Sequence, residues 1–388
     1  MTMHEPRIAE ESGRLTIHGL FFAGSDEACD VVIENGRVAA IEDSGDTGKW
    51  LCLPPLADLH VHANRAFTPP AARPKGLDDA VQNVAAIFDS FSTSDYQRHA
   101  SLLYKAALEN GTTRLRTHAD VGGHARMRAV EGSLLAAIDF TAIDIEVVAF
   151  GASSCDPAND AGRSMLRDAI RAGAHYLGAV PAFCADPAAT IDAILDLSIE
   201  LDVPVDLHLD EHLDADSSFS EHLAKATIER GLHGRVTLGH ACAVAVMQRE
   251  TRMRVLDRLA EAQVTVIALP RTNLYLQDIQ DGGPRLRGVT CVQEMLDRNI
   301  AVRFASDNVR DAFYPFGDAD LLGVAMDGIL ATRVDDPRTI AALICDGRSR
   351  IEVGDAASMV LIAGTSFDDV ISAPPAERWL FRDGLFKM

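Results

Sequence analysis

The chain has 388 residues, 47% of them hydrophobic, and a formal net charge of −21. It can therefore form a large domain beside a smaller one, and the acidic balance disfavours a nucleic-acid partner, because binding a phosphate backbone requires clustered Lys and Arg. The seven cysteines form no CxxC pair, no secretion signal stands at the N-terminus and no apolar run approaches ~20 residues, so we expect a cytoplasmic protein with reduced thiols that binds a small molecule and no membrane.

A small β-rich unit is expected at the two ends of the chain. Residues 14–42 alternate as strands do, and Asn35-Gly36 supplies the positive φ values of a tight hairpin turn. At the far end, residues 358–362 and 379–386 repeat a strand–turn–strand pattern. We expect residues 1–54 and 345–388 to share one β-sandwich, with two unrelated terminal hairpins as the alternative.

Between the two ends, short apolar runs alternate with amphipathic stretches, the pattern of a parallel sheet with crossover helices. Eight strands are predicted, at residues 56–62, 113–118, 145–151, 175–181, 203–209, 235–240, 264–269 and 301–306. Helices are predicted between them, among others at residues 92–110, 186–201 and 221–230. Eight strands indicate an α/β fold with a (β/α)₈ TIM-like barrel over residues 55–344. An open doubly wound sheet is the alternative, disfavoured because no glycine-rich phosphate loop follows the first strand.

Histidines and an aspartate stand at the carboxyl ends of four predicted strands. His60 and His62 end the first strand two residues apart, so both point to the same face. His208 ends the fifth strand, His240 ends the sixth, and Asp307 follows the eighth. Barrel enzymes place their chemistry at this end of the strands, so we expect one site. Imidazoles and a carboxylate suit Zn²⁺ or Fe²⁺, with Mn²⁺ as a further option, and leave room for a water.

This ordered set resembles the amidohydrolase superfamily, and it is most similar to the branch with the cytosine deaminases and the N-isopropylammelide amidohydrolases. The likeness covers nearly the whole chain, including the segments Arg116-Thr-His-Ala-Asp, His208-Leu-Asp-Glu and Ala305-Ser-Asp-Asn. It implies a metal site whose ligands are His60, His62, His208 and Asp307. It also implies that Glu211 shuttles protons and that His240 hydrogen-bonds the metal-bound hydroxide.

The residue types suit hydrolytic deamination. A metal ion held by neutral imidazoles lowers the pKa of its water from about 16 to roughly 7. Asp307 can accept the water proton, and Glu211, three residues beyond His208, is placed to carry it to a ring nitrogen and then to the leaving amine. A solvated acid is the alternative for Glu211, since Asp210 and Asp214 are neighbours.

One metal ion per chain is predicted from the lysines. Two-metal members of the superfamily bridge their ions with a carboxylated lysine from a middle strand. The five lysines of this chain, none in a predicted barrel strand, are Lys49, Lys75, Lys105, Lys225 and Lys387.

The substrate pocket is predicted from residues that follow the strands on the same face, namely Arg65, Phe150, Ala152, Arg271, Asn308 and Phe313. Ala152 stands where cytosine deaminases carry a glutamine, so the resemblance implies a substrate other than cytosine. Arginine donors suit a carboxylate or a keto-rich ring, and the aromatic rings suit a flat substrate. Ion pairs with nearby acids and core packing are the alternatives for these two groups.

We predict a metal-dependent amidohydrolase that deaminates a small amino-substituted nitrogen heterocycle, an enzyme acting on carbon–nitrogen bonds other than peptide bonds. One alternative uses the same site to release an N-alkylamine or to hydrolyse a cyclic amide or imide. Another is a catalytically silent binding protein on the same fold. The resemblance further implies a homo-oligomer.

Overall fold

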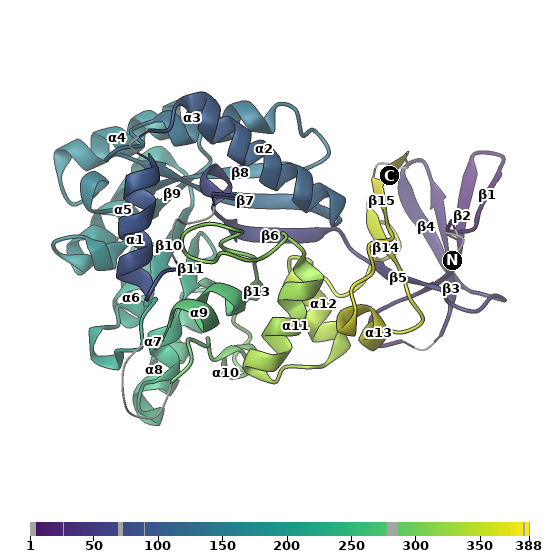
Figure 1. Ribbon diagram of the computed structural model, residues 1–388. Helices are drawn as coiled ribbons and strands as arrows, with labels where there is room; N and C mark the ends of the chain where they lie inside the picture. The colour runs from purple at the N-terminus through teal and green to yellow at the C-terminus, as the bar shows by residue number, and fades with distance from the viewer. Residues whose placement is uncertain are drawn as a thin grey trace.

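The computed structural model describes residues 5–25, 27–68, 73–88, 90–277, 286–382 and 385–387. A parallel barrel forms the larger body, and a separate sheet built from both ends of the chain stands beside it (Figure 1). The expected α/β fold with a (β/α)₈ barrel is therefore confirmed. In the described part of the chain, no helix combines the length and apolar character needed to cross a membrane.

All eight predicted barrel strands are present, in sequence order and hydrogen-bonded in parallel. They are β6 (Leu56–Val61), β7 (Thr112–Val121), β8 (Asp144–Gly151), β9 (Tyr176–Ala179), β10 (Val205–Leu209), β11 (Val236–His240), β12 (Thr265–Ala268) and β13 (Val302–Phe304). Their residues are almost all buried, as expected of a sheet covered by helices outside and filled by side chains inside. A single parallel bridge between Val61 and Asp307 brings β6 beside the segment after β13, so the barrel is nearly closed.

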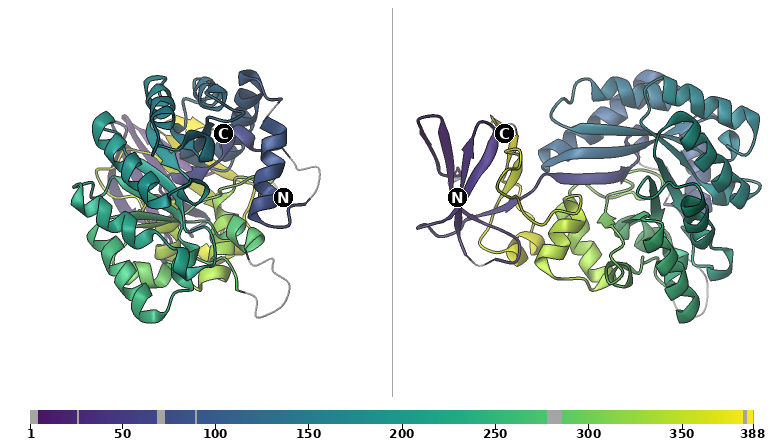
Figure 2. Two further views of the ribbon diagram at one scale, coloured as in Figure 1. Left: turned by 90° about the vertical axis from the view of Figure 1, so that its left-hand side faces the viewer. Right: turned by 180° about the vertical axis from the view of Figure 1, so that it is seen from behind.

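Helices follow the strands and cover the outside of the barrel (Figure 2). They are α1 (Leu77–Phe88), α2 (Thr93–Glu109), α3 (Arg128–Ala137), α4 (Asp160–Arg171), α5 (Pro187–Leu201), α6 (Ser220–Glu229), α7 (Cys242–Ala245), α8 (Arg249–Glu261), α9 (Pro270–Leu276), α10 (Val292–Leu296), α11 (Leu321–Thr332) and α12 (Pro337–Ile344). The three helices predicted by range are α2, α5 and α6. Ser92 and Asp95 start α2 with a capping box, each side chain accepting from the other residue's N–H, which satisfies donors that the first turn leaves free.

The terminal segments share one sheet, as expected. Its strands are β1 (Ile8–Glu11), β2 (Arg14–Phe21), β3 (Cys29–Glu34), β4 (Arg37–Asp43), β5 (Trp50–Leu53), β14 (Met359–Ala363), β15 (Arg378–Arg382) and β16 (Leu385–Lys387), and the short helix α13 (Phe367–Ser372) links β14 to β15. The predicted turn between β3 and β4 has φ +50° at Asn35 and +72° at Gly36. The strands form one continuous hydrogen-bonded sheet, and side chains from both chain ends pack into a single core cluster.

The terminal sheet is joined to the barrel by the chain and by a buried ion pair. Pro54 and Pro55 alone separate β5 from β6, and we propose a domain boundary there and another after α12. Arg378 of β15 donates to both carboxylate oxygens of Asp320, at 2.8 and 2.6 Å. Asp320 in turn caps the N-terminus of α11, so the ion pair ties the sheet to a barrel helix.

Candidate metal centre and active site

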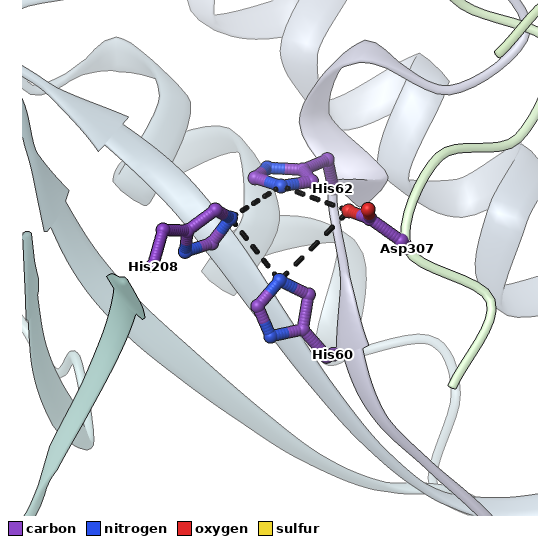
Figure 3. Close-up of side chains that lie close together, drawn as sticks. All are labelled: His60, His62, His208 and Asp307. Carbon is purple, nitrogen blue, oxygen red and sulfur yellow. Dashed lines mark hydrogen bonds and ion pairs between the residues drawn. The ribbon is translucent and has the colours of Figure 1, made fainter. Parts of the chain in front are cut away.

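The four predicted metal ligands converge at the carboxyl end of the barrel (Figure 3). The ligand atoms of His60, His62, His208 and Asp307 all lie within 4.8 Å of one another. His208 Nε2 is 3.1 Å from His60 Nε2 and 3.0 Å from His62 Nε2. Asp307 Oδ1 is 3.4 Å from His62 Nε2 and 3.8 Å from His60 Nε2. The structure thus gathers residues from β6, from β10 and from the segment after β13.

The protonation of these residues suits a cation. Burial lowers the pKa of all three imidazoles well below its usual range, so each ring is neutral and offers a lone pair. Burial also raises the pKa of Asp307 to about 7, and among the described residues neither oxygen of this carboxylate finds a hydrogen-bond donor. Around a tetrahedral ion with bonds of about 2.1 Å, ligand atoms stand ~3.4 Å apart, close to the spacing seen. The donor set therefore fits a divalent metal ion.

The backbone at the strand ends has unusual conformations. φ is +76° at His240 and +58° at Asp307, in the left-handed region that costs other residues than glycine about 1–3 kcal/mol. Main-chain hydrogen bonds fix Asp307 against β6, because its N–H donates to the His60 carbonyl at 2.8 Å and its carbonyl accepts from the His62 N–H at 3.2 Å. At Gly239, a Cβ would lie 2.6 Å from His60 Cε1, so only glycine leaves room for that ligand.

Glu211 and His240 lie together beside the ligands. Glu211 Oε2 is 3.5 Å from His240 Nε2. Asn273 Nδ2 donates to His240 Nδ1 at 2.9 Å, and burial lowers the pKa of His240 to about 3, so the neutral ring carries its proton on Nε2, facing Glu211. Burial, and then the charge of Asp307, raise the pKa of Glu211 well above its usual range. Asn273, an ordinary polar residue of α9, carries no sequence signal for its role.

A buried ionic network that was not predicted lies beneath the ligands. Arg116 of β7 donates to Asp206 Oδ2 of β10 at 2.9 Å and to Glu146 of β8 at 2.9 Å. The other oxygen of Asp206 lies 3.3 Å from His118 Nε2 and 3.9 Å from His60 Nδ1. Asp206 therefore stands below the metal ligand His60, on the side of the ring that faces away from the other ligands.

A cavity opens beside the ligands. Its lining includes five of the predicted substrate-binding residues, Arg65, Phe150, Ala152, Asn308 and Phe313. The Phe150 ring packs against the His208 ring, with 4.4 Å between the two ring centroids. The amide of Asn308 is already engaged, since it donates to Asp311 at 2.7 Å and accepts from Thr272 at 3.4 Å.

Arg271, the sixth predicted substrate-binding residue, does not line this cavity. Its guanidinium pairs with Asp327 at 2.6 Å and with Asp318 at 3.1 Å. Helix α9 begins at Pro270 directly after β12, and it directs Arg271 toward α11 rather than toward the ligands. Arg271 therefore forms ion pairs with nearby acids, which was the alternative to a contact with the substrate.

One wall of the cavity comes from α1, which was not among the predicted helices. Leu77, Val81 and Val84 line the cavity, and their spacing is that of one helix face. This periodicity is a signal that sequence reasoning could have used. Asp120, at the end of β7, also lines the cavity and was not predicted.

A parallel barrel with a His and Asp cluster and a further acid at its carboxyl end is typical of metal-dependent hydrolases. A model of the amidohydrolase family matches residues 158–378, and the chain belongs to that family. The chain is 27% identical to a pterin deaminase of Rhizobium rhizogenes over 92% of this chain and 86% of the relative. It is 28% identical to the N-isopropylammelide isopropyl amidohydrolase of Pseudomonas sp. over 80% of this chain and 78% of the relative.

The fold is shared with the crystal structure of a 5-methylcytosine deaminase from Klebsiella pneumoniae. The TM-score is 0.87 at 22% identity, and the match covers 96% of this chain and 97% of the other. The resemblance to the amidohydrolase superfamily seen in the sequence is thus confirmed. As a member of this family, the protein is a hydrolase of carbon–nitrogen bonds that depends on a divalent metal.

Proposed function

We propose that this protein deaminates a small amino-substituted nitrogen heterocycle other than cytosine. The observation that carries this proposal is the position of Glu211 and His240, in contact with each other, beside the His and Asp cluster and on the wall of the cavity. The similarity to a pterin deaminase supports it. Cytosine is disfavoured because Ala152 lines the cavity where cytosine deaminases carry a glutamine, and alanine offers no hydrogen bond to the ring edge.

The metal would be held by His60, His62, His208 and Asp307. A bound divalent ion lowers the pKa of its water to roughly 7 and so makes a nucleophile available at neutral pH. We propose one ion per chain, Zn²⁺ or Fe²⁺, with Mn²⁺ as a further option. Among the described residues, no lysine lines the cavity. A second close group is formed by His60, His118 and Asp206, but Arg116 already neutralises Asp206 there and disfavours another cation.

The proton transfers are assigned to three side chains. Asp307 accepts the proton of the attacking water. Glu211 takes up that proton and delivers it to a ring nitrogen, then carries the second proton of the water to the leaving amine, which departs as ammonia. Burial raises the pKa of Glu211, which favours its protonated form during these transfers. His240 donates a hydrogen bond from Nε2 to the attacking oxygen, because Asn273 fixes the opposite nitrogen as an acceptor.

Ammonia release tests the proposal. Metal-loaded protein would be incubated with amino-pyrimidines, amino-triazines, amino-purines and pterins, and ammonia would be quantified. Glu211→Gln should lower kcat on the active ring by about 10³-fold while the metal content stays unchanged. Glu221→Gln is the matched control, because Glu221 lies on α6 and pairs with the exposed Arg254. No ammonia from any ring, or full activity in Glu211→Gln, would contradict the proposal.

Release of an alkylamine is the second candidate function. The similarity to an N-isopropylammelide isopropyl amidohydrolase favours it, and so does the apolar wall of Leu77, Val81 and Val84, which suits an alkyl substituent. The same panel with N-alkylated triazines, analysed for free amines by chromatography, separates the two functions. Hydrolysis of a cyclic amide or imide would instead consume substrate without releasing ammonia or an amine.

We also propose that the enzyme is a cytoplasmic homo-oligomer. All seven cysteines are free thiols, which suits a reducing compartment. Sedimentation equilibrium of the purified protein measures the number of subunits.

A further inference from the structure

Arg65 and Asp120 lie side by side in the wall of the cavity. Arg65 Nη1 is 3.9 Å from Asp120 Oδ1, with side chains that are 6% and 23% exposed. This distance exceeds that of a hydrogen bond, so the two groups do not satisfy each other. The cavity therefore presents a donor and an acceptor next to each other, close to the predicted reaction centre.

The Arg65 guanidinium is held in one orientation. Its Nε donates to Asp311 Oδ2 at 3.3 Å, and its Cζ lies 4.4 Å from the centre of the Phe313 ring. Asp311 is fully buried and also accepts from Asn308 Nδ2 and from the Phe313 N–H. Within the ranges that the structure describes, no hydrogen bond reaches Nη1 or Nη2 of Arg65. The terminal N–H groups are thus fixed in position and remain available to a ligand.

The Asp120 carboxylate is held in a similar way. Asn64 Nδ2 donates to Asp120 Oδ2 at 2.7 Å. No side chain or N–H of the described segments donates to Oδ1, the oxygen nearer to Arg65. One oxygen of Asp120 is therefore positioned by the protein, and the other can accept a hydrogen bond from a ligand.

Resting on the proposed function, we propose that Arg65 and Asp120 determine specificity by binding a neutral lactam edge of the substrate, a ring N–H next to an exocyclic oxygen. The oxygen accepts from the Arg65 terminal N–H groups, and the ring N–H donates to Asp120 Oδ1. The substrate thus offers an acceptor to the donor Arg65 and a donor to the acceptor Asp120. The oxygen and the ring N–H of a lactam are neighbours, as Arg65 and Asp120 are in the cavity wall.

The surrounding charge favours a neutral lactam over a carboxylated ring, which the sequence had left open. Arg65 already faces two carboxylates, Asp120 and Asp311. Glu211 and Asp307 line the same cavity. A substrate carboxylate bound to Arg65 would stand beside Asp120 and would meet repulsion of like charges, whereas a lactam N–H meets an acceptor there.

The lactam edge also lies near the reacting carbon. Arg65 and Asp120 line the same cavity as Glu211 and Asp307. The ring that carries the amino group, or one fused to it, is the ring that carries the lactam.

Matched pairs of rings test the inference. Guanine, pterin and isocytosine each have an amino group beside a lactam edge, and 2-aminopurine, 2-aminopteridine and 2-aminopyrimidine lack only that edge. We expect kcat/KM for the lactam member of the active pair to exceed that of its partner by on the order of 10²–10⁴. Equal kcat/KM values for both members would overturn the inference and leave the deaminase proposal standing.

Two variants test whether Asp120 and Arg65 are the residues that produce the preference for a lactam ring. Asp120→Asn removes the carboxylate acceptor without touching a metal ligand or Asp311, and Arg65→Lys keeps the charge but loses the planar donors. Both should lower the lactam preference by about 10-fold or more, mainly through KM, at unchanged metal content. Asp160→Asn is the matched control, because the side chain of Asp160 on α4 is 99% exposed. A preference that survives Asp120→Asn would overturn the inference, even if the Arg65 variant fails to fold.

A failure of the proposed deaminase function can be distinguished experimentally from a failure of the lactam inference. If no ring releases ammonia, calorimetric titration of metal-loaded protein with xanthine, lumazine and uracil still probes the edge. Binding of one of these lactams that is lost in Asp120→Asn and kept in Asp160→Asn supports the inference without any turnover. No binding of the three lactams would overturn it.

Discussion

Replacing Asp206 with asparagine perturbs the metal site from below. For His60 to present Nε2 to an ion, Nδ1 must carry the ring proton, and that N–H needs an acceptor. Asp206 Oδ1 lies 3.9 Å from His60 Nδ1, longer than a hydrogen bond, and 3.3 Å from His118 Nε2, so its charge acts on the His60 N–H electrostatically. Loss of a carboxylate that is hydrogen-bonded to a metal-bound histidine weakens metal binding by about 10–100-fold, or about 1.4–2.7 kcal/mol. Because the contact in this structure is longer, we expect a loss at the lower end of that range in Asp206→Asn.

The same variant should also lower the stability of the fold. Arg116 is nearly fully buried and pairs with Asp206 at 2.9 Å. Breaking a buried ion pair costs about 3–5 kcal/mol, and we expect the lower end of that range because Glu146 continues to pair with Arg116 at 2.9 Å. Metal affinity and stability must therefore be measured separately.

Competition with a chelator measures the metal affinity of the folded protein, and urea unfolding of the metal-free protein measures stability. Glu146→Gln is the matched control, because it weakens the other ion pair of Arg116, whereas Glu146 has no close contact with the imidazole of His60 in the structure. This control should lose stability and keep its metal affinity. An affinity in Asp206→Asn within about two-fold of the wild type would refute the reasoning, as would an equal loss of affinity in Glu146→Gln.

Three further perturbations test other parts of the structure. Gly239→Ala places a Cβ 2.6 Å from His60 Cε1, so we expect reduced metal content by elemental analysis and about 100-fold lower kcat/KM; a fully loaded variant would contradict this. Arg378→Gln removes the paired hydrogen bonds to Asp320, whose side chain is 10% exposed, and should cost about 3 kcal/mol in urea unfolding; an unchanged midpoint would be inconsistent with it. Burial alone would raise the pKa of Asp30, but hydrogen bonds outweigh it and hold that pKa below its usual value. The stabilisation by Asp30 should thus be constant above about pH 5 and shrink as the pH falls below about 4; a difference between wild type and Asp30→Asn that is flat down to acid pH would argue against it.

The barrel could be predicted from sequence because its strands are buried on both faces. Runs such as residues 264–269 are largely apolar, short and bounded by loop residues, and they become strands such as β12 (Thr265–Ala268). Ligands at strand ends are predictable for the same reason, since parallel strands bring their carboxyl ends together. His208 and Asp307 could thus be placed in one site although 98 residues separate them in the chain.

Side chains on the helices that follow the strands could not be placed in this way. Arg271 and Asn273 are two residues apart on α9, and a helix turns residues with that spacing to different faces. Asn273 meets His240, whereas Arg271 meets the acids near α11. Which of them entered the site depended on where the helix began, at Pro270, and the sequence pattern did not fix that residue.

The sequence did contain a signal for the buried ion pair of Arg116 and Asp206. Arg116 precedes His118 by two residues on β7, and Asp206 precedes His208 by two on β10. Residues two apart on a strand share a face, so a charged residue two positions before an interior histidine must also point inward. One such position carries a cation and the other an anion, and they form the pair seen in the structure.

The role of the Arg116–Asp206 pair is explained better by its effect on the neighbouring metal ligands than by its contribution to the stability of the fold. A buried ion pair replaced by well-packed apolar residues often leaves a protein as stable or more stable, so the fold does not by itself require Arg116 and Asp206. The ring nitrogens of His60 and His118 that face Asp206 are buried and form no hydrogen bond with the described residues. Apolar replacements would remove the charge that faces them, the Asp206 carboxylate at 3.9 and 3.3 Å. Burial alone would raise the pKa of Asp206, but the neighbouring His118 and then Arg116 outweigh burial and lower it. The ion pair with Arg116 thus helps to maintain an anion beneath the histidines, which favours a neutral imidazole that turns its lone pair toward a metal ion.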